Sequence, residues 1–310
     1  MKKFKLMLTR GLTLTLLAVL TSTVLMAQSR YTGSGTEADP YQISSISDWN
    51  AFADTVSKGT NYSGKFFKLT ADISINVYND SDTVVKSDKI AGYWNSDKNY
   101  KPFSGTFDGN GYTLTFNVGL KKGAYIPGAN GKNSYPSAPF RVIDGATIKN
   151  LHVVGKIVST RKFNSGFVGF AYSKKYNNRD NIINNCTSSI VIDCSNIFYD
   201  GESDETRKYD CSSGGFVCEN KKNSDGNVDS KLKLTNCIFD GSINKGSNTK
   251  ANRVAGVVGF NGNASVNIEY EDCIMAGTID LSSVISTFSR NGHTAYSGRC
   301  LFVPIMATFL

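Results

Sequence analysis

The 310-residue chain carries 34 Lys and Arg against 26 Asp and Glu, which gives a net charge of +8. With 29 Gly, 6 Pro and 40% hydrophobic residues, the composition is typical of a turn-rich all-β protein and excludes a disordered or collagen-like chain. Basic and acidic residues are interspersed, so the sequence predicts no nucleic-acid partner, which would need a clustered basic face.

The first 27 residues predict a secretory signal peptide. Their basic side chains lie within the first ten residues, residues 12–20 are largely apolar, and Leu25–Ala27 fits a cleavage site before Gln28. The apolar run is interrupted by threonines and is shorter than the roughly 20 residues of a membrane-spanning helix, so we expect no transmembrane segment in the mature chain. The leader holds four basic residues and no acidic ones, so without it 30 basic residues face 26 acidic ones and the net charge is +4. We therefore expect an exported protein at the cell surface, in the outer membrane or outside the cell.

Residues 28–75 are expected to form an N-terminal cap with one short helix, and residues 76–310 a repeat domain. Ser47 can cap a helix in which Trp49, Phe52 and Val56 recur at helical spacing before Gly59. Terminal units of stacked repeats are commonly atypical because they cover the open end of the stack, and this helix would do so. The segment 64–73 predicts the first strands.

Two segments before the repeats carry side chains that could belong to a site. Asp108–Gly111 contains an acidic residue of the kind that sugar-cleaving β-helix enzymes use. However, Asp-Gly and Asn-Gly are turn signals, and we interpret this block as a turn. Residues 119–139 are polar and Gly-rich and predict a loop on the side of the stack, with Tyr125 and Tyr135 in it.

The second half of the chain repeats one short pattern, at residues 146–157, 183–192, 234–243 and 270–279. Apolar residues alternate with polar ones, as in a strand with one buried face, and no unit has the spacing of an amphipathic helix. Each unit is too short to enclose a core alone, so we expect the units to stack as parallel strands. The first buried column of this stack would be Leu151, Cys186, Cys237 and Cys273. The last would be Ile157, Ile192, Ile243 and Ile279.

A polar residue stands just before each member of the first column, where the chain must turn a corner. Asn and Asp suit a corner because their short side chains bond nearby backbone and tolerate a left-handed φ. The four residues are Asn150, Asn185, Asn236 and Asp272. The sequence therefore predicts an all-β solenoid, a parallel β-helix.

A second block precedes the last three units. Gly166–Gly169 and Gly256–Gly259 resemble the GLUG motif, which consists of Gly, Leu, a bulky apolar residue and Gly, and Gly215–Cys218 departs from it at the last position. The segments 33–43 and 103–114 are similar to opening segments of that family, so the resemblance spans residues 33–279. It implies a single-stranded right-handed parallel β-helix and a secreted or surface-attached bacterial protein, often adhesin-like. The family has no common catalytic residues, so none is carried over.

No recognised catalytic or metal-binding motif is present in the sequence. His152 and His293 lie far apart, and His152 is expected to face solvent from its strand. There is no His-Glu-x-x-His, no Cys-x-x-Cys and no nucleophile elbow, so we predict no catalytic residue and no metal ligand. A non-enzymatic role is favoured. The alternative is a polysaccharide lyase or glycoside hydrolase that uses side chains projecting from adjacent coils.

A polar insertion at residues 195–210 separates Cys194 from Cys211. Export would place this pair in an oxidising compartment, so we predict a disulfide across the base of the insertion. Acidic side chains in the insertion could hold Ca²⁺ through oxygen ligands, but their spacing matches no established loop and we favour a solvated cluster. They are Asp200, Glu202, Asp204 and Glu205. No other cofactor is expected.

These features favour a surface binding or adhesion module that contacts glycans or host and matrix proteins. Tyrosine rings in loops offer apolar contact with a polar tip, and they are the candidate ligand-binding residues: Tyr125, Tyr135, Tyr199 and Tyr209. A structural spacer is a third possibility, although no second domain follows for it to present. Residues 299–310 would form either a final strand or a truncated ending.

Overall fold

The computed structural model describes residues 31–79, 85–120, 135–159, 162–172, 179–195, 212–221, 231–244, 253–261, 268–280 and 300–302. Within these residues the chain forms one α-helix and 26 β-strands, so the protein is predominantly β. The strand pairs are parallel except for two: β3 (Ile73–Asn79) with β4 (Val85–Ser87), and β5 (Tyr93–Ser96) with β6 (Asn99–Lys101). The predicted leader lies outside the described residues.

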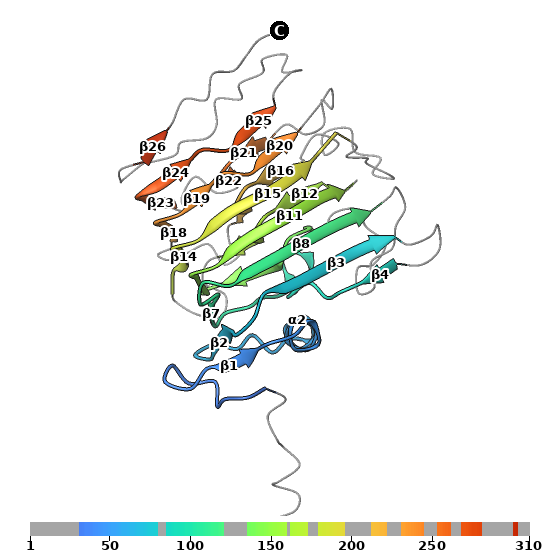
Figure 1. Ribbon diagram of the computed structural model, residues 1–310, viewed down its shortest axis with the longest axis vertical. Helices are drawn as coiled ribbons and strands as arrows, with labels where there is room; N and C mark the ends of the chain where they lie inside the picture. Colours follow the sequence, from blue (N-terminus) through green and yellow to red (C-terminus); the bar gives the residue numbers. More distant parts are fainter. Residues whose placement is uncertain are drawn as a thin grey trace, which may run out of the picture.

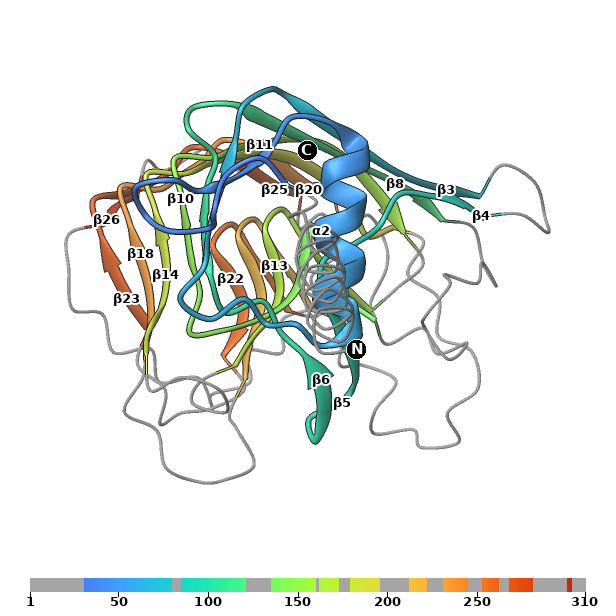
Figure 2. The same cartoon turned by 90° about the horizontal axis from the view of Figure 1, so that it is seen from below.

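Helix α2 (Ile46–Lys58) lies across the N-terminal end of the stacked strands (Figure 2). It buries Trp49, Phe52 and Val56, as the spacing predicts. The cap is Ser45 and not Ser47, because the Ser45 side chain accepts a hydrogen bond from the Asp48 backbone N–H at 3.2 Å. The helix ends at Gly59, whose φ of 113° is left-handed.

Sheet A consists of seven parallel strands stacked along the molecule (Figure 1). Its inward column pairs Ile148 with Phe107 on one side and with Ile183 on the other, and continues through Leu234 to Tyr270. The strands, in spatial order, are β1 (Tyr41–Ile43), β2 (Phe66–Leu69), β7 (Thr106–Asp108), β10 (Thr147–Lys149), β14 (Asn181–Asn184), β18 (Leu232–Thr235) and β23 (Ile268–Glu271).

Sheet B is the largest sheet, with ten strands. The register confirms the predicted isoleucine column, since Ile157 pairs with Ile192, Ile192 with Ile243 and Ile243 with Ile279. Strand β3 spans the predicted boundary between residues 75 and 76. The other strands are β8 (Thr113–Leu120), β11 (His152–Ser159), β15 (Thr187–Asp193), β19 (Ile238–Phe239), β20 (Ser242–Asn244), β24 (Cys273–Met275), β25 (Thr278–Asp280) and β26 (Cys300–Phe302).

Two smaller parallel sheets complete the molecule, and the β5–β6 hairpin packs on one of them. Sheet C contains β9 (Phe140–Asp144), β13 (Val168–Tyr172), β17 (Val217–Lys221) and β22 (Val258–Asn261). Sheet E contains β12 (Phe163–Ser165), β16 (Ser212–Gly214) and β21 (Arg253–Ala255).

The chain visits the sheets in a repeated order. It runs from β10 in sheet A to β11 in sheet B, β12 in sheet E and β13 in sheet C, and then returns to sheet A as β14, next to β10. The same circuit follows from β14 to β17 and from β18 to β22. The apolar side chains that face the space between the sheets form one continuous core. This arrangement explains why each repeat unit needs its neighbours for burial.

Each predicted corner residue adopts the left-handed conformation, which confirms the role assigned to Asn and Asp. The φ values are 52° at Asn150, 50° at Asn185, 52° at Asn236 and 49° at Asp272. The side chains also bond along the stack: Asn185 Nδ2 donates to Asn150 Oδ1 at 2.8 Å, and Asn150 Nδ2 donates to Asp108 Oδ1 at 3.0 Å. The corner therefore satisfies both its backbone conformation and its polar side chains.

The first glycine of each GLUG-like block is required by packing between adjacent coils. A Cβ at Gly166 would lie 2.4 Å from the Gly215 carbonyl oxygen, and one at Gly215 would lie 2.0 Å from that of Gly256. Any larger residue would push the coils apart. At the end of the block Cys218 replaces glycine, and its thiol donates to the Ser212 carbonyl oxygen at 2.9 Å.

Candidate binding face

The outward side of β3, β8, β11, β15, β19 and β20, here called the sheet B face, is a broad plane built by strand alternation. In β11, Val153 and Ile157 are buried, whereas Val154 and Lys156 point away from the core. About half of the outward positions carry small hydroxyl or amide side chains. Six of them are Asn76, Thr113, Thr115, Asn117, Thr187 and Ser242.

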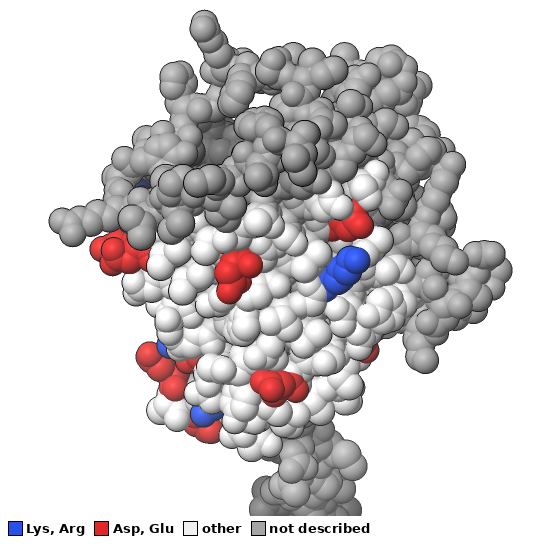
Figure 3. Space-filling view, turned by 45° about the horizontal axis from the view of Figure 1, so that its top comes forward, with Lys and Arg blue, Asp and Glu red and all other residues white. Residues whose placement is uncertain are grey.

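Charged side chains are sparse on this face, and acidic ones outnumber basic ones there (Figure 3). Lys156 is exposed on β11, Asp193 is half-buried at the end of β15, and Asp240 is exposed directly after β19. The Asp193 carboxylate accepts hydrogen bonds from the Ser195 backbone N–H at 3.0 Å and from its hydroxyl at 2.5 Å. The face is thus polar but nearly uncharged, within a chain that is basic as a whole.

One aromatic side chain, Tyr78, belongs to this face. Tyr78 on β3 pairs with Gly119 on β8, and a Cβ added at Gly119 would lie 2.7 Å from the Tyr78 Cδ1. An edge of the ring therefore lies next to the glycine, and Tyr78 is 37% exposed. Val191 and Ile238 are each 36% exposed on the same face, so apolar surface is embedded among the hydrogen-bonding groups.

Three polar side chains from successive coils form a hydrogen-bonded chain on this face. His152 Nε2 lies 2.8 Å from Ser189 Oγ, and the Ser189 hydroxyl donates to Asp240 Oδ1 at 2.5 Å. Because serine has one hydroxyl proton and gives it to Asp240, the imidazole must be the donor to Ser189. Each member then has a fixed role, and the Asp240 carboxylate is the terminal acceptor.

Backbone geometry holds the amide groups of the face in place. Asn117 Nδ2 donates to Asn76 Oδ1 at 3.1 Å, and Asn117 Oδ1 accepts from the Lys156 backbone N–H at 3.1 Å. Gly155, with φ of 116°, makes the irregularity in β11 that brings this N–H within reach, and a Cβ there would lie 2.4 Å from the Phe116 carbonyl oxygen. The side-chain amide of Asn117 is therefore fixed by hydrogen bonds to the Asn76 side chain and to the Lys156 backbone.

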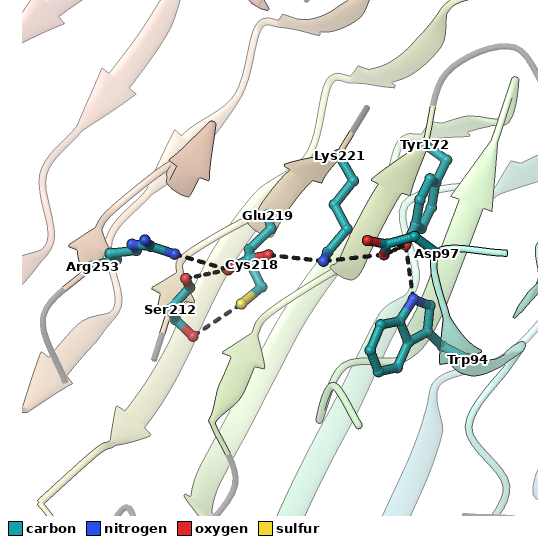
Figure 4. A network of polar contacts seen from close by, with 8 residues as sticks. All are labelled: Trp94, Asp97, Tyr172, Ser212, Cys218, Glu219, Lys221 and Arg253. Atoms are coloured by element: carbon teal, nitrogen blue, oxygen red, sulfur yellow. Dashed lines mark hydrogen bonds and ion pairs between the residues drawn. The ribbon is translucent and has the colours of Figure 1, made fainter. Parts of the chain in front are cut away.

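A second polar network links the β5–β6 hairpin to sheets C and E (Figure 4). Lys221 Nζ lies 3.4 Å from Asp97 Oδ1 and 3.4 Å from Glu219 Oε2. The Glu219 carboxylate also accepts from the Ser212 hydroxyl at 2.6 Å and lies 3.8 Å from Arg253 NH1. Asp97 additionally accepts a hydrogen bond from the Tyr172 hydroxyl.

Aromatic rings surround this network and define a small second core, here called the hairpin cluster. The Lys221 ammonium lies 4.4 Å from the centre of the Phe170 ring, and Tyr100 stacks on Tyr172 with ring centres 4.1 Å apart. Trp94 Nε1 donates to the Tyr172 hydroxyl at 2.8 Å. The cluster consists of Tyr100, Val142, Phe163, Phe170, Tyr172 and Cys218.

The geometry of the second network fits hairpin docking better than catalysis. Glu219 has a side chain only 6% exposed and is engaged by Lys221, Arg253 and Ser212, so it is not available as a general base. Burial raises the pKa of the Tyr172 hydroxyl, with the Asp97 charge adding to the effect, so this group stays protonated as a hydrogen-bond donor. The network therefore ties the hairpin to the stack.

The structure corrects one of the tyrosine predictions. Tyr135, expected on an exposed loop, is 1% exposed, and its ring centre lies 6.2 Å from that of Trp94 and 5.8 Å from the guanidinium carbon of Arg141. Its ring is buried because the hairpin and β9 pack over it, which the loop-like composition of its segment does not reveal. The other three predicted rings, Tyr125, Tyr199 and Tyr209, lie outside the described residues.

The predicted cysteine column lies in the core. Leu151, Cys186 and Cys273 are each 2% exposed, and Cys237 is 1% exposed. Strand β26 pairs with β24 in parallel register, with Cys300 opposite Cys273. Burial raises the pKa of the Cys186 thiol to about 12.

The remaining predicted sites have separate outcomes. Asp108–Gly111 is a turn, since the Asn110 N–H donates to Asp108 Oδ1 at 2.8 Å and Asn110 has a φ of 53°. Cys194 is buried at the end of β15, while Cys211 and the four acidic residues of the insertion lie outside the described residues.

Within the described ranges, no group of three or more His, Cys, Asp and Glu side chains is placed to hold a metal ion. No helix among those residues is long and apolar enough to cross a membrane.

Sequence reasoning missed both polar networks. Alternation correctly places His152 on the outer face, but the partnership with Ser189 and Asp240 depends on which strands become neighbours. The one available signal is alignment of the repeats, which puts Ser189 two residues after Thr187, the residue opposite His152. For Lys221 and Asp97, 124 residues separate the partners, and no repeat relates them.

Comparison with known proteins gives two matches. A stretch of 136 residues, 40% of this chain, is 30% identical to halomucin of Haloquadratum walsbyi, and the match covers 1% of that protein's length. The crystal structure of "a putative immunoglobulin A1 protease" from Bacteroides ovatus matches 80% of this chain and 69% of its own, with a TM-score of 0.41 and 16% sequence identity. No family model matches the sequence, so the GLUG resemblance rests on the motifs quoted above.

Proposed function

We propose that this protein is an exported, surface-associated module that binds an extended glycan along the sheet B face. We also propose that its stacked sheets form a single right-handed parallel β-helix. The repeated circuit through sheets A, B, E and C supports the architecture. The form of the first 27 residues, with a basic start and an apolar run, supports export.

The observation that carries the binding proposal is the composition of the sheet B face. Its strands are about 4.8 Å apart and successive outward side chains on a strand about 6.6 Å apart, so hydroxyl and amide groups form a regular grid. Sugars offer both hydroxyl groups and apolar ring faces. The grid supplies donors and acceptors for the former, and the exposed Tyr78 ring supplies an apolar contact surface for the latter.

A protein partner is less well supported by the same face. Stable protein interfaces are centred on clusters of buried aromatic, Met and Arg side chains surrounded by a polar rim. The sheet B face instead has one tyrosine and the scattered aliphatic residues Val154, Val191 and Ile238 among small polar groups. Long polymers with many weak, repeated contacts match this surface better than a compact partner does.

The proposal is tested by binding of the chain from Gln28 onward to a panel of immobilised polysaccharides. Tyr78→Ala should weaken retention about tenfold, because it removes the stacking ring from an exposed position. Ile46→Ala, on helix α2 and 36% exposed, is the matched control and should bind as wild type. Thermal midpoints of both variants should stay near that of wild type. Equal retention of wild type and Tyr78→Ala would contradict the proposal.

The same panel tests the enzymatic alternative. A lyase would generate unsaturated products, and a hydrolase would generate new reducing ends. We expect neither, because the carboxylates of the hairpin network are held by cations and the Asp108 carboxylate is held in its turn. Product release by wild type would reassign the protein as an enzyme.

A further inference from the structure

The charges of the sheet B face and the fixed directions of its hydrogen bonds indicate which class of glycan it would bind. It rests on the proposed function. We propose that the face selects an uncharged polysaccharide, and that Asp240 is its specificity-determining acceptor, oriented by Ser189 and His152.

An acidic glycan needs basic side chains on the surface that binds it. Proteins recognise sulfate, phosphate and uronate groups with arginine or lysine side chains, preferably as paired donors. Among the described residues of β3, β8, β11, β15, β19 and β20, the outward side chains include one such group, Lys156, whereas Asp193 lies at the end of β15 and Asp240 directly follows β19. An acidic glycan lying along the face would meet carboxylates instead of counter-charges. The face therefore discriminates against acidic glycans.

The hydrogen bonds that link His152, Ser189 and Asp240 run in one direction. His152 donates to Ser189, and Ser189 donates to Asp240 Oδ1, so the proton donors all point toward the carboxylate. The carboxylate is exposed, and its remaining lone pairs can accept from a ligand. Sugar hydroxyl groups are such donors. Sulfate esters and carboxylates are acceptors and would face the Asp240 charge unfavourably.

The orientation of the Asp240 carboxylate is set before a ligand binds. An exposed aspartate on a strand surface has several rotamers, and ordering it on binding costs free energy. The short bond to Ser189 holds one carboxylate oxygen in place before any ligand arrives. Ser189 and His152 are thus positioning residues, and Asp240 is the group that contacts the ligand.

The test compares soluble uncharged polysaccharides, such as xyloglucan and mannan, with heparin and alginate, using the chain from Gln28 onward at low and high salt. Wild type should bind at least one uncharged polysaccharide with an affinity that salt does not change, and should not bind the polyanions. Asp240→Asn should weaken that binding about tenfold, because a hydrogen bond to a charged acceptor is lost. Ser189→Ala should weaken it less, and Ser189→Thr, which keeps the hydroxyl, should restore it.

Asp272→Asn is the matched control for the loss of a carboxylate. Asp272 is exposed and lies at a corner off the face, where the equivalent residues in other coils are asparagine. This variant should fold and bind as wild type, and the thermal midpoint of Asp240→Asn should match it.

The outcomes separate this inference from the function on which it rests. If wild type binds no glycan of the panel, the proposed function fails and the inference fails with it. If wild type binds and Tyr78→Ala weakens binding, but Asp240→Asn has no effect, the function stands and the inference is wrong. Salt-sensitive binding of heparin or alginate that exceeds binding of the uncharged polymers would also overturn the inference alone.

Discussion

At the scale of single residues, the buried thiols show how this fold uses polar atoms inside its core. Each thiol of the column donates to the carbonyl oxygen two residues before it, at 3.2 Å for Cys186 and 3.4 Å for Cys237 and Cys273. These carbonyls lie at the corners, and each also accepts a backbone N–H from the preceding coil, as Asn184 does from Asn150 at 3.0 Å. A cysteine therefore fills the place of Leu151 in the later coils and gives the corner carbonyl group a second donor, which leucine cannot supply.

The raised pKa of Cys186 predicts a loss of stability in alkali. Its thiol ionises near pH 9 when unfolded and at about 12 when folded, because burial disfavours the thiolate. The stabilising contribution is fully present below pH 9 and is lost as the pH rises from 9 toward 12. In that window this thiol should lower the free energy of unfolding by about 1.4 kcal/mol per pH unit.

Urea unfolding of wild type and Cys186→Ala across that pH window measures this contribution. The variant should start less stable, because it leaves a small cavity, but its stability should fall with pH less steeply than that of wild type. The slope difference isolates Cys186 from the other thiols. Parallel slopes would show that the Cys186 thiol titrates equally in both states.

At the scale of elements, the sequence was sufficient wherever one local pattern decides the structure. The alternation in residues 146–157 predicted strands, and the asparagines before the column predicted left-handed corners. The apolar spacing of Trp49, Phe52 and Val56 predicted helix α2. These features depend on neighbours in sequence or on repetition, both of which are visible in one chain.

The elements that sequence reasoning missed depend on contacts between distant and unrelated segments. The β5–β6 hairpin belongs to no repeat, and its role comes from docking Trp94 and Asp97 against Tyr172. The burial of Tyr135 has the same origin. Ser47 was predicted instead of Ser45 because both serines precede the apolar residues of the helix, and only the contact of Ser45 with the Asp48 N–H distinguishes them.

The hairpin contacts predict a specific effect of Tyr172→Phe. Loss of the hydroxyl leaves Trp94 Nε1 without this acceptor and Asp97 without this donor, so we expect a destabilisation of about 1–3 kcal/mol. The hairpin should also open more often and expose Cys218 beneath it. Peptide-resolved thiol labelling and urea unfolding measure the two effects. Tyr78→Phe, at an exposed ring, should change neither, and unchanged Cys218 labelling in Tyr172→Phe would contradict hairpin docking by this network.

At the scale of the whole molecule, parallel stacking makes stability depend on both the ends and the seams of the coils. Helix α2 covers the N-terminal end, and Trp49 packs there with its ring centre 5.9 Å from that of Phe107 and 5.7 Å from that of Phe140. Along the sides, the insertion at residues 195–210 interrupts the path from β15 to β16. A covalent link would stabilise the fold at such an interruption, because it lowers the conformational entropy that the unfolded chain loses when this loop closes.

The disulfide between Cys194 and Cys211 stays a prediction for the exported protein, and of the two cysteines the structure describes only Cys194. Its sulfur lies 3.0 Å from the hydroxyl oxygen of Ser213, a residue only two positions after Cys211. We expect the chain recovered from an oxidising compartment to begin at Gln28 and to contain this disulfide, and expect Cys218 to remain a thiol. Closing a loop of this length should stabilise the fold by about 3 kcal/mol in the chain-entropy model. Reduction should therefore lower the urea midpoint of wild type but not that of Cys194→Ala, and non-reducing peptide mapping that finds Cys194 and Cys211 both as thiols would refute the link.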